Sequence, residues 1–181
     1  MENSVSAAPA PPLVSLPVVT VAKERKYSSS HRLPWHEGKC HHLHGHTFVL
    51  RVYVTGPVQP VVKMDSKSGM VADFAVIGEW LQQLDQVLDH KHLNDTIDRY
   101  PTAERMVRRL AYLAKRDLEP RLPPGAAVSK LRFYEEHCFP GAFAEVSFVG
   151  RAGTIYCGEP IEPEQPPDSE LFAEGKTSHV T

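Results

Sequence analysis

Two stretches in the first third of the chain alternate apolar and polar side chains, as strands with one buried face do. Residues 18–28 alternate imperfectly, whereas residues 47–55 (TFVLRVYVT) are β-branched and aromatic and keep a period of two. We therefore predict two strands here, the second with one apolar face. The side chains of that face are Phe48, Leu50, Val52 and Val54.

The middle of the chain first reads as a turn and then as a helix. Residues 56–70 are turn-like, and beyond them apolar residues recur at helical spacing until close to Asp89. Asp73 is placed to cap the first turn of this helix. The predicted buried positions are Ile77, Trp80, Leu81, Leu84, Val87 and Leu88.

A second helix is predicted to begin at the sequence PTAE. Pro101 stops the preceding loop, Thr102 can act as the N-cap and Glu104 suits the positive end of the helix dipole. The loop EPRLPPG, residues 119–125, ends this helix. Its predicted buried stripe is Met106, Val107, Leu110, Leu113 and Ala114.

Two further strand-like runs, residues 128–137 and 142–149, complete the pattern. The order strand, strand, helix, helix, strand, strand predicts an α+β fold, a four-stranded antiparallel sheet with two helices on one face. Such a sheet has two open edges, which favour pairing with another subunit or closure into a barrel. We therefore expect a homo-oligomer.

Composition limits the fold to one domain and removes several kinds of partner. The ends, residues 1–17 and 158–181, are rich in proline and polar residues and are predicted to be disordered tails around a domain at residues 18–157. A net charge of -2 and the lack of a long basic run argue against a nucleic-acid partner. The chain has neither an apolar run of the roughly 20 residues that span a bilayer nor a secretory leader pattern, so we expect no membrane partner and a cytoplasmic location.

The stretch EGKCHHLHGHTF holds four histidines and a cysteine within twelve residues. His44 and His46 are one residue apart and lead into the second strand, so both imidazoles can project from one face. His31 ends the preceding strand and is the best candidate for a third ligand. Three histidines without a fourth protein ligand describe an open, catalytic zinc site, whereas the alternative is a run of solvated loop residues.

The three cysteines, Cys40, Cys138 and Cys157, are odd in number and widely spaced, so a disulfide framework is not expected. Cys40 lies four residues before His44. It could be a fourth ligand that closes the metal site, a nucleophile or base beside the metal, or a small buried residue. The pattern alone favours none of these strongly.

The dipeptide Asp89–His90, in LDHKHLND, is a second chemical signal. A carboxylate that accepts the imidazole N–H fixes the tautomer and makes the ring a better proton acceptor. The alternative is a helix C-terminus at which histidine satisfies carbonyl groups. Glu104 and Glu135 are exposed acids by default, although Glu135 lies in a strand, where a carboxylate is less expected.

Six motifs in order, SSSHRL, GKCHHLHGHTF, GMVADF, LDHKHLND, PTAE and FYEEH, give the chain a family likeness. Over residues of about 20 to 150 it resembles the 6-pyruvoyltetrahydropterin synthase superfamily. The resemblance implies the tunnelling fold, whose strands oligomerise into a barrel, and self-association into a hexamer built as a dimer of trimers. It also implies a pterin triphosphate as the small-molecule substrate.

The resemblance also implies roles for individual residues. It implies that His31, His44 and His46 bind Zn²⁺. A catalytic triad would comprise Cys40, Asp89 and His90, with the cysteine and the Asp-His pair supplied by different subunits. The pterin would be held by Thr102, Glu104 and Glu135, of which Glu104 accepts hydrogen bonds from the guanidine-like edge of the ring.

The spacing Cys-x-x-x-His-Gly-His in KCHHLHGH is similar to that of the bacterial 6-carboxytetrahydropterin synthases of the queuosine pathway. This likeness implies conversion of 7,8-dihydroneopterin triphosphate to 6-carboxy-5,6,7,8-tetrahydropterin with loss of acetaldehyde and triphosphate. The alternatives are a 6-pyruvoyltetrahydropterin synthase and a non-catalytic zinc-binding protein. Glu136 departs from the family, which usually has threonine there.

Overall fold

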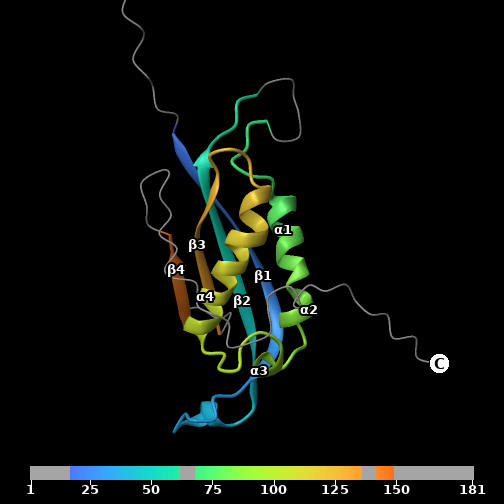
Figure 1. Ribbon diagram of the computed structural model, residues 1–181, viewed down its shortest axis with the longest axis vertical. Helices are drawn as coiled ribbons and strands as arrows, with labels where there is room; N and C mark the ends of the chain where they lie inside the picture. Colours follow the sequence, from blue (N-terminus) through green and yellow to red (C-terminus); the bar gives the residue numbers. More distant parts are fainter. Residues whose placement is uncertain (1–16, 62–67, 136–141, 149–181) are drawn as a thin grey trace, which may run out of the picture.

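The computed structural model describes residues 17–61, 68–135 and 142–148 as two layers, a sheet and the helices that cover one of its faces (Figure 1). The sheet is antiparallel with the order β1-β2-β3-β4. This arrangement confirms the predicted α+β class with four strands. The strands are β1 (Val18–His31), β2 (His44–Pro57), β3 (Ala127–Tyr134) and β4 (Phe143–Ser147).

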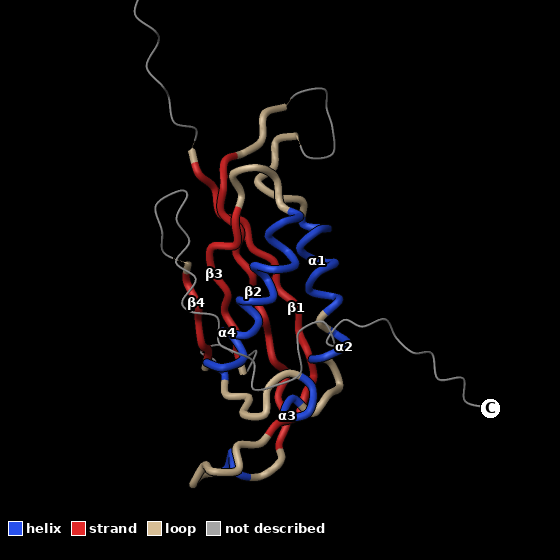
Figure 2. The backbone as a smooth tube through the Cα atoms, in the orientation of Figure 1, coloured by secondary structure: helices blue, strands red, loops and turns tan. Residues whose placement is uncertain are grey.

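The helices divide the covered face between them (Figure 2). Helices α1 and α2 pack against β1, and α4 packs against β3 and β4. The α-helices are α1 (Phe74–Gln83), α2 (Asp85–Leu88), α3 (Leu93–Thr96) and α4 (Ala103–Leu113). Shorter pieces are η1 (Lys39–His41), the π-helical continuation of α4 called η2 (Ala114–Leu118) and η3 (Glu119–Arg121).

The core lies between the sheet and the helices, and it contains the apolar positions that the periodicity predicts. Phe48 stacks on Phe133 of β3 with ring centroids 5.1 Å apart. Tyr27 is fully buried, and its hydroxyl donates a 2.8 Å hydrogen bond to the Leu81 carbonyl of α1. Trp80 is also fully buried. Burial of such large side chains on one face of β1 and β2 fixes which face of each strand points inward.

The structure differs from the predicted elements in several places. β3 ends at Tyr134, so Glu135, which was predicted to lie in a strand, follows it. β1 and β2 continue to His31 and His44, because their pairing persists to that end of the hairpin. The helix predicted as one piece is interrupted at Leu84, where Val87 and Leu88 both donate to the Leu84 carbonyl. The short helix α3 was not predicted, since four residues are too few to show a helical period.

The sequence predicts two open edges of the sheet, but the edge of β1 is partly covered. Residues 89–92 lie against the part of β1 nearest His31. His90 N–H donates to the Ser28 carbonyl over 2.6 Å, and Ser30 N–H donates to the Lys91 carbonyl over 2.9 Å. This contact brings the Asp-His dipeptide to the sheet.

Several predictions fall on parts of the chain that the structure does not describe. These include most of both tails, the end of the domain near residue 157, Glu136, Cys138 and Cys157. None of the helices in the described ranges has the length and apolarity that crossing a bilayer requires.

The N-cap of α1 provides a test of the helix assignment. The Asp73 carboxylate accepts a 2.7 Å hydrogen bond from Ala75 N–H. We expect Asp73→Ala to lower the free energy of unfolding by about 1 kcal/mol, because a first-turn N–H loses its acceptor. Urea denaturation measures this change. Asp73→Asn keeps an acceptor and is the control, and equal destabilisation by both substitutions would contradict the cap.

Candidate metal and catalytic site

Three histidines meet where β1 ends and β2 begins. His31 and His44 are direct cross-strand partners, and His46 follows on the same face of β2. The ring centroids of His31 lie 4.5 Å from His44 and 5.2 Å from His46, and those of His44 and His46 are 4.9 Å apart. One nitrogen from each ring lies within 4.8 Å of the others, so the three histidines form a group that could hold a metal ion.

Backbone carbonyls fix the orientation of two of these rings. His31 Nδ1 lies 2.9 Å from the Pro101 carbonyl, and His44 Nδ1 lies 2.8 Å from the His42 carbonyl. A carbonyl only accepts, so each Nδ1 carries a proton, and in the neutral form of each ring Nε2 keeps its lone pair. Metal-binding histidines are commonly held in this way.

His31 is the most buried member of the group. His31 is only 1% exposed, and its Nε2 has no hydrogen-bond partner among the described residues. Burial lowers the pKa of His31 to about 4, with smaller contributions from the neighbouring imidazoles of His44 and His46. The ring therefore stays neutral at physiological pH, which is the form that binds a metal. The donor set and the orphaned buried nitrogen both fit a zinc ion.

The Pro101 carbonyl joins the metal group to the PTAE turn. Thr102 caps α4, as predicted, and its hydroxyl accepts from Arg105 N–H over 3.4 Å. Asp98, which is 6% exposed, accepts from Tyr100 N–H at 2.8 Å and from Arg105 Nε at 2.9 Å. These bonds hold the turn in the shape that presents the Pro101 carbonyl to His31.

Sequence reasoning missed the residues that brace this turn. Asn94 accepts from Arg32 N–H at 3.0 Å and donates to the Arg32 and Arg99 carbonyls at 2.9 and 3.1 Å. It therefore ties the residue after His31 to the segment before Pro101. Its place in the motif LDHKHLND was the available signal, but the motif does not say which backbone groups the amide would reach.

Cys40 lies in η1, within the loop that joins β1 to β2. Its thiol is free and half-buried, and its carbonyl accepts from Leu33 N–H at 2.8 Å. The metal-capable group in the described residues consists of the three histidines and does not include Cys40. This composition favours an open coordination sphere over a sphere closed by the thiolate.

Asp89 and His90 are hydrogen-bonded at the edge of β1, where Asp89 Oδ2 lies 3.0 Å from His90 Nδ1. The other carboxylate oxygen accepts from Ser28 N–H at 2.8 Å. The Ser28 bond is the main cause that lowers the pKa of Asp89, and the pairing with His90 adds to it. His90 has a φ of 55° and an 81% exposed side chain, so its ring faces outward with one nitrogen held by a carboxylate.

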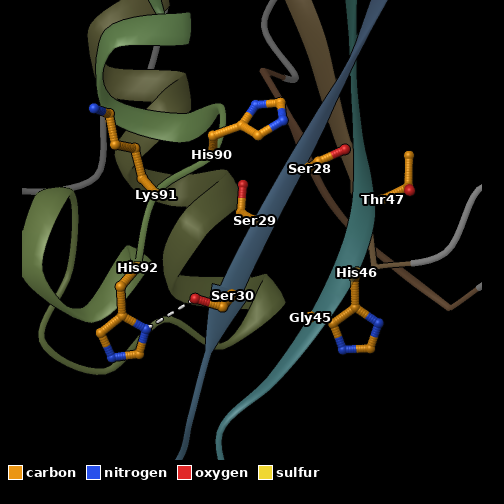
Figure 3. A pocket seen from close by; sticks show the side chains of 9 residues that line it. All are labelled: Ser28, Ser29, Ser30, Gly45, His46, Thr47, His90, Lys91 and His92. Carbon is orange, nitrogen blue, oxygen red and sulfur yellow. Dashed lines mark hydrogen bonds between the residues drawn. The ribbon is translucent and has the colours of Figure 1, made fainter.

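An open groove of about 570 Å³ runs beside this pair (Figure 3). Figure 3 shows His90 beside Ser28 and His92 beside Ser30 along the edge of β1, with His46 and Thr47 on the neighbouring strand. His46 therefore belongs both to the metal group and to the lining of this groove. Within one chain the groove connects the edge that carries His90 to the strand that carries His44 and His46.

The other predicted residues lie apart from one another. Glu104 is exposed in the first turn of α4. Glu135 follows β3, is half-buried and donates its N–H to the Ala142 carbonyl at 3.1 Å. Within the described part of this single chain, neither Asp89 nor His90 is hydrogen-bonded to Cys40. One chain thus assembles the three histidines and the Asp-His pair but does not join that pair to the cysteine.

Curated proteins with similar sequences carry one recurring name, 6-carboxy-5,6,7,8-tetrahydropterin synthase. The protein of that name from Synechocystis sp. is 43% identical over 86 residues, which cover 46% of this chain and 65% of that protein. One from Haemophilus influenzae is 40% identical over 30% of this chain and 37% of its own length. One from Rickettsia felis is 27% identical over 71% of this chain and 100% of its own length. The chain therefore spans less than two thirds of the first two relatives.

Solved structures show the same fold. The 6-pyruvoyl tetrahydropterin synthase of Caenorhabditis elegans superposes with a TM-score of 0.56 at 24% identity, covering 75% of this chain and 99% of its own. An uncharacterized protein from Wolinella succinogenes also has a TM-score of 0.56, at 20% identity, covering 72% of this chain and 98% of its own. The family model for 6-pyruvoyl tetrahydropterin synthase matches residues 20–146, which include the histidine group, the Asp-His pair and the PTAE turn. The chain belongs to the 6-pyruvoyl tetrahydropterin synthase family.

Proposed function

We propose that this chain is a zinc-dependent lyase, a 6-carboxy-5,6,7,8-tetrahydropterin synthase. Its substrates are 7,8-dihydroneopterin triphosphate and one water molecule, and it releases acetaldehyde and triphosphate in a step of 7-deazaguanine (queuosine) biosynthesis. Family membership, the names of several relatives and the KCHHLHGH spacing support this proposal. The observation that carries it is the trio of His31, His44 and His46, braced by the Pro101 carbonyl of the PTAE turn.

The metal ligands in this proposal are the three histidines. His31 and His44 offer Nε2 because their Nδ1 protons are held by carbonyl oxygens. With no cysteine among the metal-capable residues of the described chain, a position stays open for the substrate. If zinc is bound by these histidines, it would supply Lewis-acid polarisation of the substrate's side-chain oxygens and so acidify the adjacent C–H bonds.

Proton movement falls to the cysteine and the Asp-His pair. Asp89 holds Nδ1 of His90 and leaves the opposite nitrogen of this exposed ring available. An imidazole in that arrangement can keep a cysteine thiol deprotonated. Cys40 as thiolate then accepts and returns protons at the substrate's side chain.

Pterin recognition is assigned to the two glutamates and the helix N-terminus. Glu104 lies in the first turn of α4, two residues after the N-cap Thr102 and three after Pro101, whose carbonyl orients His31. A carboxylate matches the paired N–H donors on the guanidine-like edge of a pterin. Glu135, at the end of β3, is proposed as a second contact to the substrate.

The triad requires more than one chain in this proposal. Cys40 and the Asp-His pair are not hydrogen-bonded within the described single chain, and the proposed hexamer, a dimer of trimers, brings the cysteine of one subunit to His90 of another. Closure of the sheets into a barrel would provide this assembly. The polar outer face of the sheet, with ion pairs such as Arg51–Glu24 and Lys130–Glu145, suits the wet interior of such a barrel.

The reaction is tested by product identification. We expect purified protein given 7,8-dihydroneopterin triphosphate to release acetaldehyde and form the 6-carboxy pterin, and we expect a strong chelator to stop both. Chromatography of the pterins and an acetaldehyde assay measure the outcome. A 6-pyruvoyl pterin as the final product would identify the other synthase activity, and zinc binding without any turnover would indicate a non-catalytic metal protein.

Single substitutions separate metal ligands from the proposed base. We expect His46→Ala to weaken zinc binding by more than about a hundredfold. Loss of a group that only hydrogen-bonds a metal ligand already costs roughly 10–100-fold, and loss of the ligand itself costs more. Cys40→Ala should keep stoichiometric zinc and lose turnover. His41→Ala, which removes a neighbouring imidazole outside the trio, is the control for both. Zinc measured by elemental analysis after dialysis gives the answer, and zinc loss in Cys40→Ala would make the thiol a ligand.

Mixed oligomers test the shared triad. We expect Cys40→Ala and His90→Ala chains to be inactive alone but active together. Random mixing places an intact cysteine against an intact Asp-His pair at about a quarter of the interfaces. Co-expression with two different tags isolates the mixed oligomers. Their complete inactivity, with zinc bound and the size unchanged, would contradict a site shared between subunits.

A further inference from the structure

The serine triplet that precedes His31 lies against the segment that carries the Asp-His pair. Ser28, Ser29 and Ser30 occupy the part of β1 that faces residues 88–92. Two of the three hydroxyls reach that segment. Ser29 donates to the Leu88 carbonyl, and Ser30 lies 3.2 Å from His92 Nδ1. The hydroxyls thus act just before and just after the Asp-His pair.

Ser29 is the buried member of the triplet, at 8% exposure. Its hydroxyl donates to the carbonyl of Leu88, the last residue of α2. The last carbonyls of a helix have no partner within the helix. The Ser29 hydroxyl therefore completes the C-terminus of α2 from the neighbouring strand. This bond fixes the point from which Asp89 leaves the helix.

The backbone of Ser29 is held from its other side by the metal-bearing strand. Ser29 pairs directly with His46, and its carbonyl approaches Gly45 so closely that a Cβ there would lie 3.1 Å from the oxygen. A residue locked in this way gives its hydroxyl a fixed position. Ser29 thus connects the paired strands β1 and β2 to the end of α2 through one hydrogen bond.

The Asp-His pair needs such support because its own conformation is unfavourable. His90 has a φ of 55°, a left-handed conformation that residues with a Cβ rarely adopt, and most of its ring is in solvent. Three contacts hold the pair in place. His90 N–H donates to the Ser28 carbonyl, the Asp89 carboxylate accepts from Ser28 N–H, and its other oxygen pairs with His90 Nδ1. Each of these depends on where the chain leaves α2.

We propose that Ser29 is a positioning residue, which through its hydrogen bond to Leu88 sets the Asp89–His90 pair in the geometry that proton transfer requires. This inference rests on the proposed function for its catalytic consequence. Its structural part, that the Ser29 hydroxyl holds the pair against β1, stands independently of that function.

The test compares two serines that make the same kind of bond. Ser29→Ala removes the hydroxyl that donates to Leu88. Ser129→Ala, in β3, removes a hydroxyl that donates to the Tyr53 carbonyl at 3.3 Å and is the matched control, since it lies away from the site. Ser29→Thr keeps the hydroxyl and should restore the properties of the unsubstituted protein. If Ser29→Ala does not fold, Ser29→Cys, with similar volume and a weaker donor, takes its place.

Hydrogen exchange provides the readout that does not need catalysis. We expect the amide protons of Ser28 and His90 to exchange about tenfold faster in Ser29→Ala, because their partners are no longer held in place. Ser129→Ala should leave these two amides unchanged. Unaltered exchange at both amides in the folded Ser29 variant would overturn the proposal.

Kinetics then tests the catalytic consequence in the zinc-loaded protein. We expect kcat to fall about tenfold to a hundredfold in Ser29→Ala with little change in KM and an unchanged zinc content, since a displacement of about 1 Å can cost that much. Full kcat in a variant with accelerated exchange would overturn the positioning role. If the unsubstituted protein turns over no pterin, the proposed function fails, and the exchange measurement still decides whether Ser29 holds the pair.

Discussion

The antiparallel register between β1 and β2 is the constraint on which the site depends. It sets His31 opposite His44 and Ser29 opposite His46, so that three imidazoles share one face. The same register pairs Tyr27 with Phe48, both buried in the core. A slip of one residue would turn every side chain of a strand to the opposite face. Burial of the aromatic core therefore determines the geometry of the metal group.

Much of the site is built from backbone groups. The carbonyls of Pro101 and His42 orient His31 and His44, and the N–H of Ser28 holds the Asp89 carboxylate. Such partners are fixed by the fold and cannot titrate away. The imidazoles therefore have their protons in place before any ligand arrives, and little rearrangement is required on binding. The turn that begins α4 therefore also orients one histidine of the group that could hold a metal ion.

Local patterns in the sequence predicted most of the helices and strands and the group of three histidines that could hold a metal ion. The alternation around Phe48 gave the inner face of β2, and extending it backwards placed His44 and His46 together. Asp73 and Thr102 were identified as N-caps because capping depends on neighbours in the chain. The metal group was predictable for the same reason, since a strand's period of two relates His44 to His46 and a hairpin relates both to His31.

The features that could not be predicted depend on contacts distant in sequence. The interruption at Leu84 precedes Asp85, which pairs with Arg25 of β1, and no periodicity encodes that contact. The same holds for Pro101 against His31 and for Asn94 against Arg32. The roles proposed for Cys40, Glu104 and Glu135 rest on the family resemblance, because an isolated side chain carries no pattern.

The segment that occupies the edge of β1 has a consequence for how sheets can join. A strand from a second chain that extended the sheet there would find free backbone groups only along residues 18–27, because residues 28–30 are already bonded to residues 89–92. Such a strand must therefore attach toward the far end of β1, displaced from the histidines. In a closed ring of sheets a displacement of this kind tilts the strands against the barrel axis. The turn that carries His90 would then also help to set the tilt of the strands in such a barrel.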